Sequence, residues 1–319
     1  MQVNPLVTII CLCYNQQDYI LESLFSVINQ DYPCIELIIV DDCSTDNSRA
    51  VIEKWRLDFP KIQFIANDFN LGSTKSFNKA LKKSKGEYII DLAADDVLLP
   101  NCVSLQLNAF KNTAYENLGV VYGNAELITE KGVFNSHYFP VNHLKKVITP
   151  RITGNIYETV LSGGDCMCSV SAMVKKSVFD SLNGYDESLA YEDLDFWIRA
   201  SRIYDFDFID TVLIQKRTVK NSLGTHFFKK NDARARKINQ STYLILKKAI
   251  ALNRTKKENK AVLKRMHFEL ILTYKTANYT LFFKYIILEI KLRLHVFFSY
   301  SRSSNIHPML LSLLANLLK

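Results

Sequence analysis

The sequence lacks the glycine-rich motifs that bind phosphate in the commonest nucleotide-binding folds. No Gly-x-Gly-x-x-Gly follows its first apolar run, which argues against a dinucleotide site of the usual type. No Gly-x-x-x-x-Gly-Lys-Ser/Thr is present, which removes the P-loop interpretation. Internal repeats and low-complexity tracts are also missing, and the hydrophobic and aromatic content is that of a globular protein.

The seven cysteines lack the Cys-x-x-Cys spacing of zinc sites and thioredoxin-like motifs. Several fall inside apolar strand-like runs, where cysteine behaves as a small hydrophobic residue. The odd count, together with the absence of a visible export signal before the first strand-like run, indicates reduced thiols. We therefore expect a cytoplasmic location.

Charge is divided unevenly along the chain. Residues 1–215 carry 18 Lys and Arg against 28 Asp and Glu, whereas residues 216–319 carry 22 against 4. The first part has a net charge of −10 and the second of +18. A basic C-terminal part on an acidic body indicates that this part meets an anionic partner. The length of 319 residues allows one large α/β domain with an appendage, or two domains.

The N-terminal part alternates between strand-like and helix-like segments with short links. Apolar runs typical of buried strands occupy residues 6–13, 35–40, 62–66 and 88–92. Helical spacing follows the first three of them, at 18–29, at 48–58 and after the turn at 70–72. This alternation predicts an α/β fold with a mostly parallel sheet and helices on both faces.

Further elements are predicted after the fourth strand. They are a helix at 101–110, a strand at 120–124, a hairpin near 129–133, a strand-like run at 169–175 and helices at 176–182 and from about 192.

Polar residues gather at the carboxyl ends of three predicted strands, as Tyr14-Asn15, Asp41-Asp42 and Asp95-Asp96. Ligands of such sheets bind outside these strand ends. Hard divalent cations take carboxylate oxygens, and an acidic pair is costly without a cation. The Asp95-Asp96 pair alone fits a metal site and an exposed strand-to-loop junction equally well.

A second acidic pair, Glu192-Asp193, precedes an apolar helical face. Carboxylates are favourable in the first turn of a helix because of its dipole. Helix capping therefore explains an isolated pair of this kind.

Taken together, the motifs over residues 5–220 resemble those of glycosyltransferase family 2, which is inverting and has the GT-A fold. Any one motif is weak, but they stand in the order of that family. They are Val7-Thr-Ile-Ile-Cys-Leu-Cys-Tyr-Asn15, Ser26-Val-Ile-Asn-Gln30, Glu36-Leu-Ile-Ile-Val-Asp-Asp-Cys-Ser-Thr-Asp46, Asn70-Leu-Gly72, Asn78, Gly86-Glu-Tyr-Ile89, Ala94-Asp-Asp96, Gly184-Tyr-Asp-Glu187 and Glu192-Asp193.

The resemblance implies a UDP-, dTDP- or GDP-sugar donor and a divalent cation, Mg²⁺ or Mn²⁺, that neutralises its diphosphate. Asp96 would ligate the metal, and Asp95 would contact the ribose or the waters on the metal. Asp42 would accept the N3–H of the base, with Asp41 in support. The residues that would line the nucleotide pocket are Leu12, Tyr14 and Asn15.

The resemblance also implies that Asp193, paired with Glu192, takes the proton of the acceptor hydroxyl. One direct displacement would then invert the anomeric carbon. The implied acceptor is a glycan or a lipid-linked glycan, as in bacterial surface-polysaccharide synthesis. We expect Trp197 to support the site by packing and Arg199 by pairing with an acid.

The chain departs from the family pattern at two positions. Ala93 stands where many members have the first acid of an Asp-x-Asp-Asp motif, and Val219 stands where many have a histidine. His226 would approach the diphosphate or metal in place of the missing histidine, although an ordinary surface histidine is commoner. Arg217 or Lys220 would hold the diphosphate instead. Lys75 either reaches the base or phosphate or lies on a solvated helix face.

We predict a catalytic domain over 1–225 and a basic helical region over 226–319. The most apolar stretch, 279–298, carries charges that would prevent it from spanning a bilayer. Its basic stripe and wide apolar face fit a helix in the interface of an anionic membrane, on the inner face of the cell membrane. Packing of this helix on the catalytic domain fits equally well.

Three other functions compete with sugar transfer. A sugar nucleotidyltransferase would normally have a glycine-rich, basic first loop, which the segment Tyr14-Asn-Gln-Gln-Asp18 is not. A non-catalytic carbohydrate-binding protein of the same fold would not need all of Asp42, Asp95, Asp96 and Asp193. A nucleic-acid binder is disfavoured because the acidic body would repel phosphate chains and the basic part has no recognised motif. The oligomeric state does not follow from the sequence.

Overall fold

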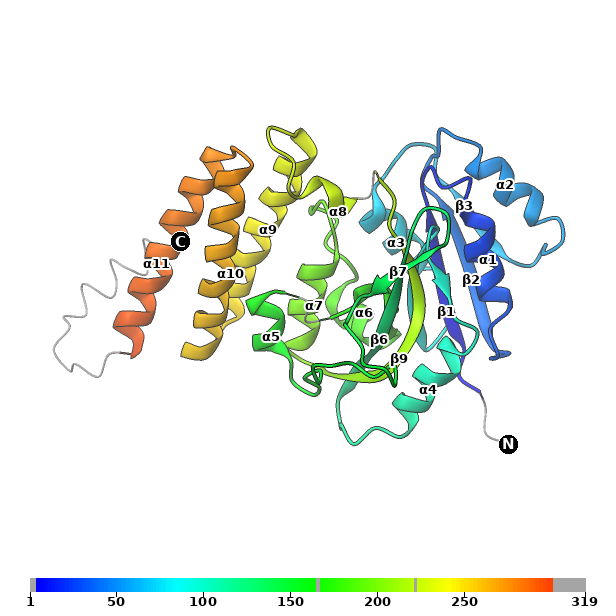
Figure 1. Ribbon diagram of the computed structural model, residues 1–319, viewed down its shortest axis with the longest axis horizontal. Coiled ribbons are helices and arrows are strands. Elements are labelled where there is room, and N and C mark those ends of the chain that lie inside the picture. Colours follow the sequence, from blue (N-terminus) through cyan, green and yellow to red (C-terminus); the bar gives the residue numbers. More distant parts are fainter. Residues whose placement is uncertain (1–3, 165–166, 221–222, 301–319) are drawn as a thin grey trace. The chain divides into compact units, whose positions relative to one another are not determined.

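The computed structural model describes residues 4–164, 167–220 and 223–300. Within these ranges the chain divides into two compact units. Residues 4–156 and 167–220 form the first unit, which contains a nine-stranded sheet (Figure 1). Residues 157–164 and 223–300 form the second unit, which is helical.

Four parallel strands form the N-terminal half of the sheet, in the order β3–β2–β1–β4. They are β1 (Val7–Cys13), β2 (Ile35–Asp41), β3 (Gln63–Ala66) and β4 (Tyr88–Ala93). Nearly every side chain of β1 is buried, as expected for a parallel strand covered by helices on both faces. These strands confirm the four apolar runs predicted as strands.

The other strands make the sheet mixed. β8 (Met173–Lys175) runs antiparallel to β4 and to β6 (Leu118–Ile128). β6 is parallel to β9 (Asp205–Arg217), and β5 (Val97–Leu98) lies antiparallel to β9 at the far edge. β7 (Phe134–His137) forms the predicted hairpin with β6.

Two parts of this half differ from the sequence-based expectation. The predicted strand over 169–175 was partly wrong, because Ser169–Ser171 form a turn of 3₁₀ helix. The hydroxyl of Ser171 donates to the carbonyls of Cys168 and Gly123, and such local bonds compete with strand pairing. β9 was not predicted at all. Most of its side chains are only half-buried, so its sequence shows no apolar run.

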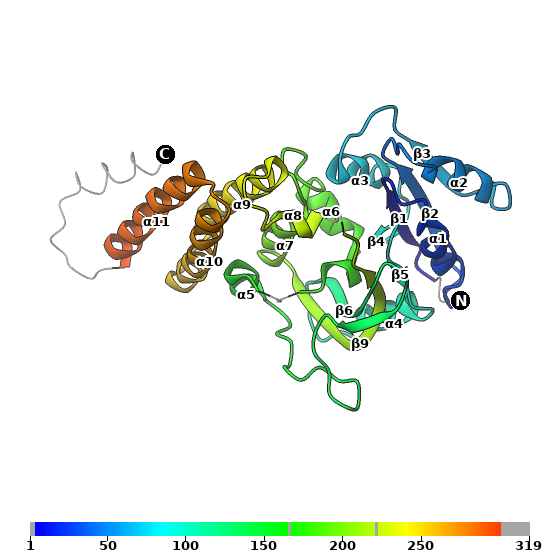
Figure 2. The same cartoon turned by 45° about the horizontal axis from the view of Figure 1, so that its top comes forward.

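Helices cover both faces of the parallel strands (Figure 1, Figure 2). α1 (Ile20–Ile28) and α2 (Ser48–Trp55) share one face, where the ring of Phe25 meets that of Trp55 edge-on at 6.1 Å. α4 (Cys102–Lys111) is tied to the end of α1 through the side chain of Gln30, which accepts a hydrogen bond from an α4 backbone N–H.

The other face carries α3 (Ser73–Leu81), α6 (Lys176–Leu182) and α7 (Asp193–Ser201). An aromatic cluster joins these three helices. The ring of Phe179 lies 5.2 Å from that of Phe77 and 4.5 Å from that of Phe196. Helices distant in the sequence are thereby packed as one layer.

The second unit consists of five helices. They are α5 (Tyr157–Ser162), α8 (Leu223–His226), α9 (Ala233–Leu252), α10 (Lys256–Lys275) and α11 (Tyr279–Tyr300). The predicted helical character of the C-terminal region is confirmed as far as residue 300, and residues 301–319 lie outside the described ranges. None of the helices described is both long and apolar enough to cross a membrane.

Asn78 of α3 fixes the loop that leads toward α7. Its side-chain N–H groups donate to the carbonyl of Tyr185 at 2.9 Å and to Glu187 at 3.0 Å, while its oxygen accepts the N–H of Tyr185. Gly184 has a φ of +71°, and a Cβ there would lie 2.4 Å from the Asn78 side-chain oxygen. Glycine is required at 184 for both reasons.

Replacement of this glycine should destabilise the first unit. We expect Gly184→Ala to lower the free energy of unfolding by roughly 2–4 kcal/mol, the cost of a left-handed alanine plus a displaced Asn78. Gly132→Ala is the matched control, because φ is +76° there and a Cβ would meet only Arg217 at 3.6 Å. Its cost should be about 1–2 kcal/mol. Equal losses in urea unfolding would show that the Asn78 contact is unimportant.

Candidate active site

The carboxyl ends of β1, β2 and β4 meet at one edge of the sheet. The strand register pairs Cys13 with Asp41 and Leu12 with Ala93. Asp42, Asn15 and the Asp95-Asp96 turn therefore leave the sheet along the same rim, as the topology predicted.

Asp42 is the most extensively hydrogen-bonded carboxylate on this rim. Its Oδ1 accepts hydrogen bonds from Asn67 Nδ2 at 2.9 Å, from the N–H of Leu71 at 2.8 Å and from Ser76 Oγ at 2.8 Å. Its Oδ2 accepts the N–H of Gly72 at 2.8 Å. Four donors satisfy the carboxylate of this buried residue and fix the turn that begins α3.

The neighbouring residues complete the loops after β1 and β2. Asp41 is buried, and its Oδ1 has no hydrogen-bond partner among the described residues. Asn15 has a φ of +55°, and its side-chain oxygen accepts the N–H of Thr45 at 2.7 Å. Leu12 is half-buried at the end of β1, and Tyr14 is 46% exposed. Tyr14 and Asn15 are thus the exposed side chains of this group.

Arg217, the last residue of β9, holds the Asp95-Asp96 turn. Its backbone N–H donates to Asp96 Oδ1 at 2.8 Å, and its Nε donates to the carbonyl of Asp95 at 3.0 Å. Its remaining guanidinium nitrogens donate to two carbonyls after β6 and to the carboxylate of Glu22. Because the side chain is buried and these donors are engaged, Arg217 orients the acidic turn.

The electrostatics of this turn favour a cation. Burial, together with the charge of Asp95, raises the pKa of Asp96 to about 8. Burial also raises the pKa of Asp95, although Arg217 and Lys216 oppose the shift. A further cation beside this pair would therefore stabilise the ionised carboxylates.

Within the described ranges, no three His, Cys, Asp or Glu side chains are grouped to hold a metal ion. A hard divalent cation often takes only one or two protein carboxylates and completes its shell with phosphate and water. Asp95 and Asp96 fit such an ion, provided that a ligand brings the other oxygens.

Glu192 and Asp193 lie at the start of α7 and are anchored by two serines. Ser73 Oγ donates to Glu192 at 2.9 Å, and Ser169 Oγ donates to Asp193 at 2.9 Å. Glu192 occupies the cap position but makes no side-chain capping hydrogen bond. Helix capping therefore does not explain this pair, whose bonds lead to α3 and to the segment before β8.

Sequence reasoning missed a third acid, Asp91, in the middle of β4. Tyr185 donates its hydroxyl hydrogen to Asp91 Oδ2 at 3.0 Å. Burial raises the pKa of Asp91 to about 7, and the charge of Asp193 adds to the shift. Burial raises the pKa of Glu192 to about 8, with Asp193 and Asp91 adding to it. The signal in the sequence that could have identified Asp91 was an acid within an otherwise apolar strand.

Hydrogen bonds connect Asp42, at the end of β2, to Glu192, at the start of α7. Asp42 binds Gly72, and the adjacent Ser73 binds Glu192. At the other end, Cys168 precedes the serine that binds Asp193. Burial raises the pKa of the Cys168 thiol to about 11, and the charge of Asp96 contributes to that rise. Both acidic pairs lie in the first unit, and we treat them as one candidate site.

Two predicted supporting residues behave as expected. Trp197 packs against Phe196 and Phe206, with ring separations of 5.0 and 6.0 Å. Arg199 pairs with Asp195 at 2.7 Å.

Two other residues predicted for the site, Lys75 and His226, take no part in the hydrogen bonds described above. Lys75 is exposed on α3. His226 belongs to the second unit, where it is buried in α8 with its Nδ1 3.6 Å from Asp232. Its predicted role as a metal ligand stays a prediction.

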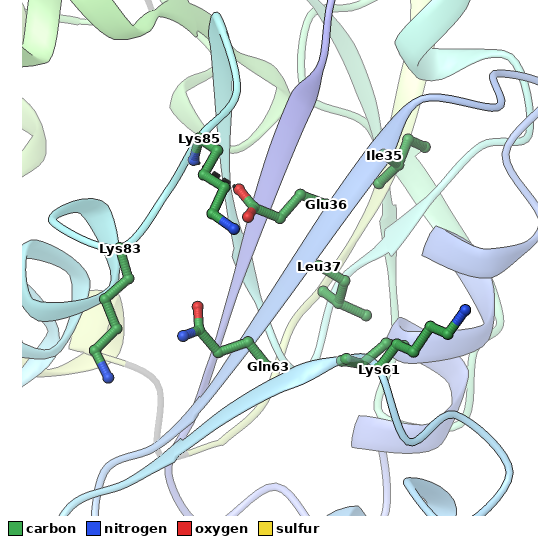
Figure 3. Close-up of a pocket in the computed structure, with 8 residues that line it drawn as sticks. Ile35, Glu36, Leu37, Lys61, Gln63, Lys83 and Lys85 are labelled. Atoms are coloured by element: carbon green, nitrogen blue, oxygen red, sulfur yellow. Dashed lines mark hydrogen bonds between the residues drawn. The ribbon is translucent and has the colours of Figure 1, made fainter.

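A pocket of about 480 Å³ opens at the amino ends of β2 and β3, away from this rim (Figure 3). It is lined by Ile35, Glu36, Leu37, Lys61, Ile62, Gln63, Lys83 and Lys85. The carboxylate of Glu36 is already bonded to Thr8 and to the backbone of Lys85. Since ligands of such sheets bind at the opposite strand ends, we do not assign this pocket to the site.

The buried acids should make stability depend on pH. Because the folded state raises the pKa of Glu192 from its ordinary 4.5 to about 8, the folded state holds its proton more tightly. The stability from this group is complete below about pH 4.5 and is lost as the pH rises through about 8. Glu192→Gln should remove this dependence.

Thermal unfolding at pH 5.5 and 8.5 measures the effect. The melting temperature of Glu192→Gln relative to the wild type should rise by at least about 2–4 °C between these two pH values, equivalent to about 1 kcal/mol. Glu53→Gln, on the exposed surface of α2, should track the wild type. A parallel pH dependence in wild type and Glu192→Gln would contradict the assignment.

Known proteins share this fold. S. aureus TarS 1–349 in complex with UDP-GlcNAc matches 90% of this chain and 81% of its own length, with a TM-score of 0.65 and 18% identity. The mannosyltransferase PcManGT from Pyrobaculum calidifontis, in complex with GDP-Man and Mn²⁺, matches 99% of this chain and 80% of its own, with a TM-score of 0.57 and 17% identity. The expected α/β GT-A fold with a helical C-terminal region is therefore confirmed.

Sequence comparison gives the family. The family model for glycosyl transferase family 2 matches residues 8–181. An uncharacterized glycosyltransferase of Methanocaldococcus jannaschii is 30% identical over 218 residues, which cover 67% of this chain and 71% of that protein. The chain spans about a third of the length of the first curated relatives that it matches. The chain belongs to glycosyl transferase family 2.

Proposed function

We propose that this chain transfers a sugar, with inversion, from a nucleoside-diphosphate donor to a hydroxyl of a glycan or lipid-linked glycan. The observation that carries the proposal is the chain of bonds from Asp42 through Gly72 and Ser73 to Glu192. It links the strand ends where a nucleotide would bind to the acid pair that would act on the acceptor.

The donor would lie along the rim. Asp42 Oδ1 accepts three hydrogen bonds and Oδ2 accepts one, so Oδ2 is the oxygen better able to take a base N–H. Leu12, Tyr14 and Asn15 would line the base and ribose, with Asp41 in support. The fold shared with proteins that hold UDP-GlcNAc and GDP-Man supports a nucleotide-sugar donor.

A divalent cation, Mg²⁺ or Mn²⁺, would be held by Asp96 with Asp95 beside it, and would neutralise charge on the departing diphosphate. Arg217 keeps the two acids in place through its bonds to the Asp95 carbonyl and the Asp96 carboxylate. Lys75 would reach the phosphates from α3.

Asp193 would act as the base. It takes the hydroxyl proton while the acceptor oxygen bonds to the anomeric carbon and the bond from that carbon to the diphosphate oxygen breaks. Ser169 orients the Asp193 carboxylate. Burial and the charges of Asp193 and Asp91 raise the pKa of Glu192 and so favour its protonated form.

A sugar nucleotidyltransferase is the second candidate. It would join a nucleotide to a sugar phosphate with acids and metal on a similar sheet. The loop after β1 is tied by Asn15 to Ser44 and Thr45, rather than open and glycine-rich. Family membership and this loop both favour sugar transfer. We place the reaction in the cytoplasm, at the inner face of the cell membrane.

Asp193 can be tested by nucleotide release from UDP-GlcNAc, GDP-mannose and dTDP-glucose with Mn²⁺. We expect Asp193→Asn to lower the rate by about 10²–10⁴-fold, the usual contribution of a general base, while donor binding is kept. Asp180→Asn, on the exposed surface of α6, should release nucleotide at the wild-type rate. Undiminished release by Asp193→Asn would remove it as the base, and no release by the wild type would count against the enzyme itself.

Metal binding should depend on the donor. With so few protein ligands, Mn²⁺ should bind weakly to the protein alone and at least about tenfold more tightly with UDP or GDP present, because the diphosphate supplies oxygens. Titration calorimetry measures both affinities, and Asp96→Asn should abolish the synergy. Equal Mn²⁺ affinity with and without nucleotide would contradict a shared site.

A further inference from the structure

We propose that one face of α11 is a docking surface for an anionic membrane. This surface lies wholly in the second unit and is independent of the sugar-transfer chemistry. The inference starts from the two faces of the helix, which differ in burial although both are apolar.

The inward face of α11 packs within its own unit. Leu281, Tyr285 and Leu292 are buried, at 2%, 0% and 1% exposure, against α9 and α10. The ring of Tyr285 meets that of Tyr243 on α9 at 5.2 Å, edge-on. These contacts cover three of the apolar residues that made the segment so hydrophobic. They also fix which side of the helix remains uncovered in this unit.

The outward face is a continuous apolar stripe. At about 100° per residue its members fall within an arc of roughly 80°, on the side opposite the buried residues. Each is at least 40% exposed, and most are more than half exposed. The members of this outer stripe are Tyr279, Phe283, Ile287, Ile290, Leu294 and Phe297. Six aligned side chains of this size form a patch rather than the scattered exposure that is normal on a surface.

The stripe continues onto α10. Tyr274 on α10 contacts the rings of Tyr279 and Phe282, with centroid separations of 6.2 and 5.9 Å. Phe268 and Ile271 precede Tyr274 on α10 and are 50% and 45% exposed. The apolar surface is therefore wider than one helix, and a flat partner would bury more of it than a narrow one.

Basic residues flank the stripe. Lys284 and Lys291 lie beside it on the α11 helical wheel, about 40–60° beyond its edge. Their aliphatic stems can lie along an apolar boundary while the ammonium groups reach anionic headgroups. An apolar face bordered along one edge by lysines is suited to a helix in the membrane interface.

The charge of the unit points to an anionic partner. Residues 223–300 contain 17 Lys and Arg against 4 Asp and Glu. All four acids are engaged internally: Asp232 and Glu258 cap α9 and α10, Glu269 pairs with Arg265, and Glu289 pairs with Arg293. The described surface of this unit therefore offers many cations and no acid without a partner.

A second copy of the chain fits this face less well than a membrane. Two such faces packed antiparallel would bring the lysine-bearing edge of one copy against that of the other, and like-charge contacts are costly at interfaces. An anionic bilayer accepts the stripe and the lysines at once. Each basic residue near such a surface contributes about 1 kcal/mol to binding.

Flotation of the full chain with vesicles tests the proposal. The wild type should float with phosphatidylcholine vesicles that contain 25% phosphatidylglycerol, and at least about tenfold less with pure phosphatidylcholine. Phe283→Ser/Ile290→Ser/Phe297→Ser should lose at least about tenfold in partitioning. Lys284→Gln/Lys291→Gln should lose about 30-fold, the effect of two surface charges.

The matched control is Leu57→Ser/Phe69→Ser/Ile148→Ser, which replaces three exposed apolar residues of the first unit. It should float like the wild type. Phe297→Trp keeps the stripe apolar, and its fluorescence should shift to the blue with anionic vesicles only. That variant distinguishes a loss of membrane binding from misfolding of the serine variant.

Three outcomes would overturn the proposal. They are a wild type that does not float with anionic vesicles, a serine variant that floats undiminished, and a wild-type dimer in light scattering that the serine variant dissociates while flotation is absent. The last result would make the stripe a self-association surface. Because no step uses activity, failure here leaves the proposed sugar transfer untouched.

Discussion

The geometry of the site depends on a buried carboxylate that is satisfied by donors from three segments. Asp42 emerges from β2 and accepts bonds from Asn67, from the turn at Leu71 and Gly72, and from Ser76 of α3. A buried charge is tolerable only when donors compensate for lost water, so these segments must meet in one arrangement. The start of α3 is thereby fixed, and with it the serine that anchors Glu192.

Burial of the acids Asp91, Asp96 and Glu192 is unfavourable for folding. We attribute this unfavourable burial to the proposed chemistry of the site. Burial raises the pKa of Asp96, Asp91 and Glu192 together, so neutral pH finds each of them close to losing its proton. Perturbed acids of this kind cluster at functional sites, where a ligand or metal relieves the cost. Arg217 moderates the repulsion around Asp95 and Asp96 without occupying the place of a cation.

The notable feature of the second unit is an exposed apolar surface. Its helices bury one side of a strongly apolar segment and leave the other side open, with lysines along one edge. A monomeric soluble protein rarely exposes such a continuous apolar patch without a partner for it. An enzyme whose acceptor is attached to lipid would benefit from a surface that keeps it at the bilayer. The basic charge of residues 223–300 would attract that surface to an anionic bilayer.

The sequence by itself determined the features that rest on local pattern. Four predominantly apolar runs specified the parallel strands. The polar residues that end them, Asp42 and Asp96 among them, fell on one rim because parallel strands share their carboxyl ends. Ordered motifs identified the family. Tertiary structure decided the features that depend on distant partners. β9 is half-buried and is held in the sheet by pairing with β6. Asp91 can be recognised as part of the site only beside Tyr185 and Asp193, and Arg217 only from its donors, which reach three other segments. Tertiary structure also decided which face of α11 is covered, because a wheel shows two apolar sides and only packing against α9 and α10 chooses between them.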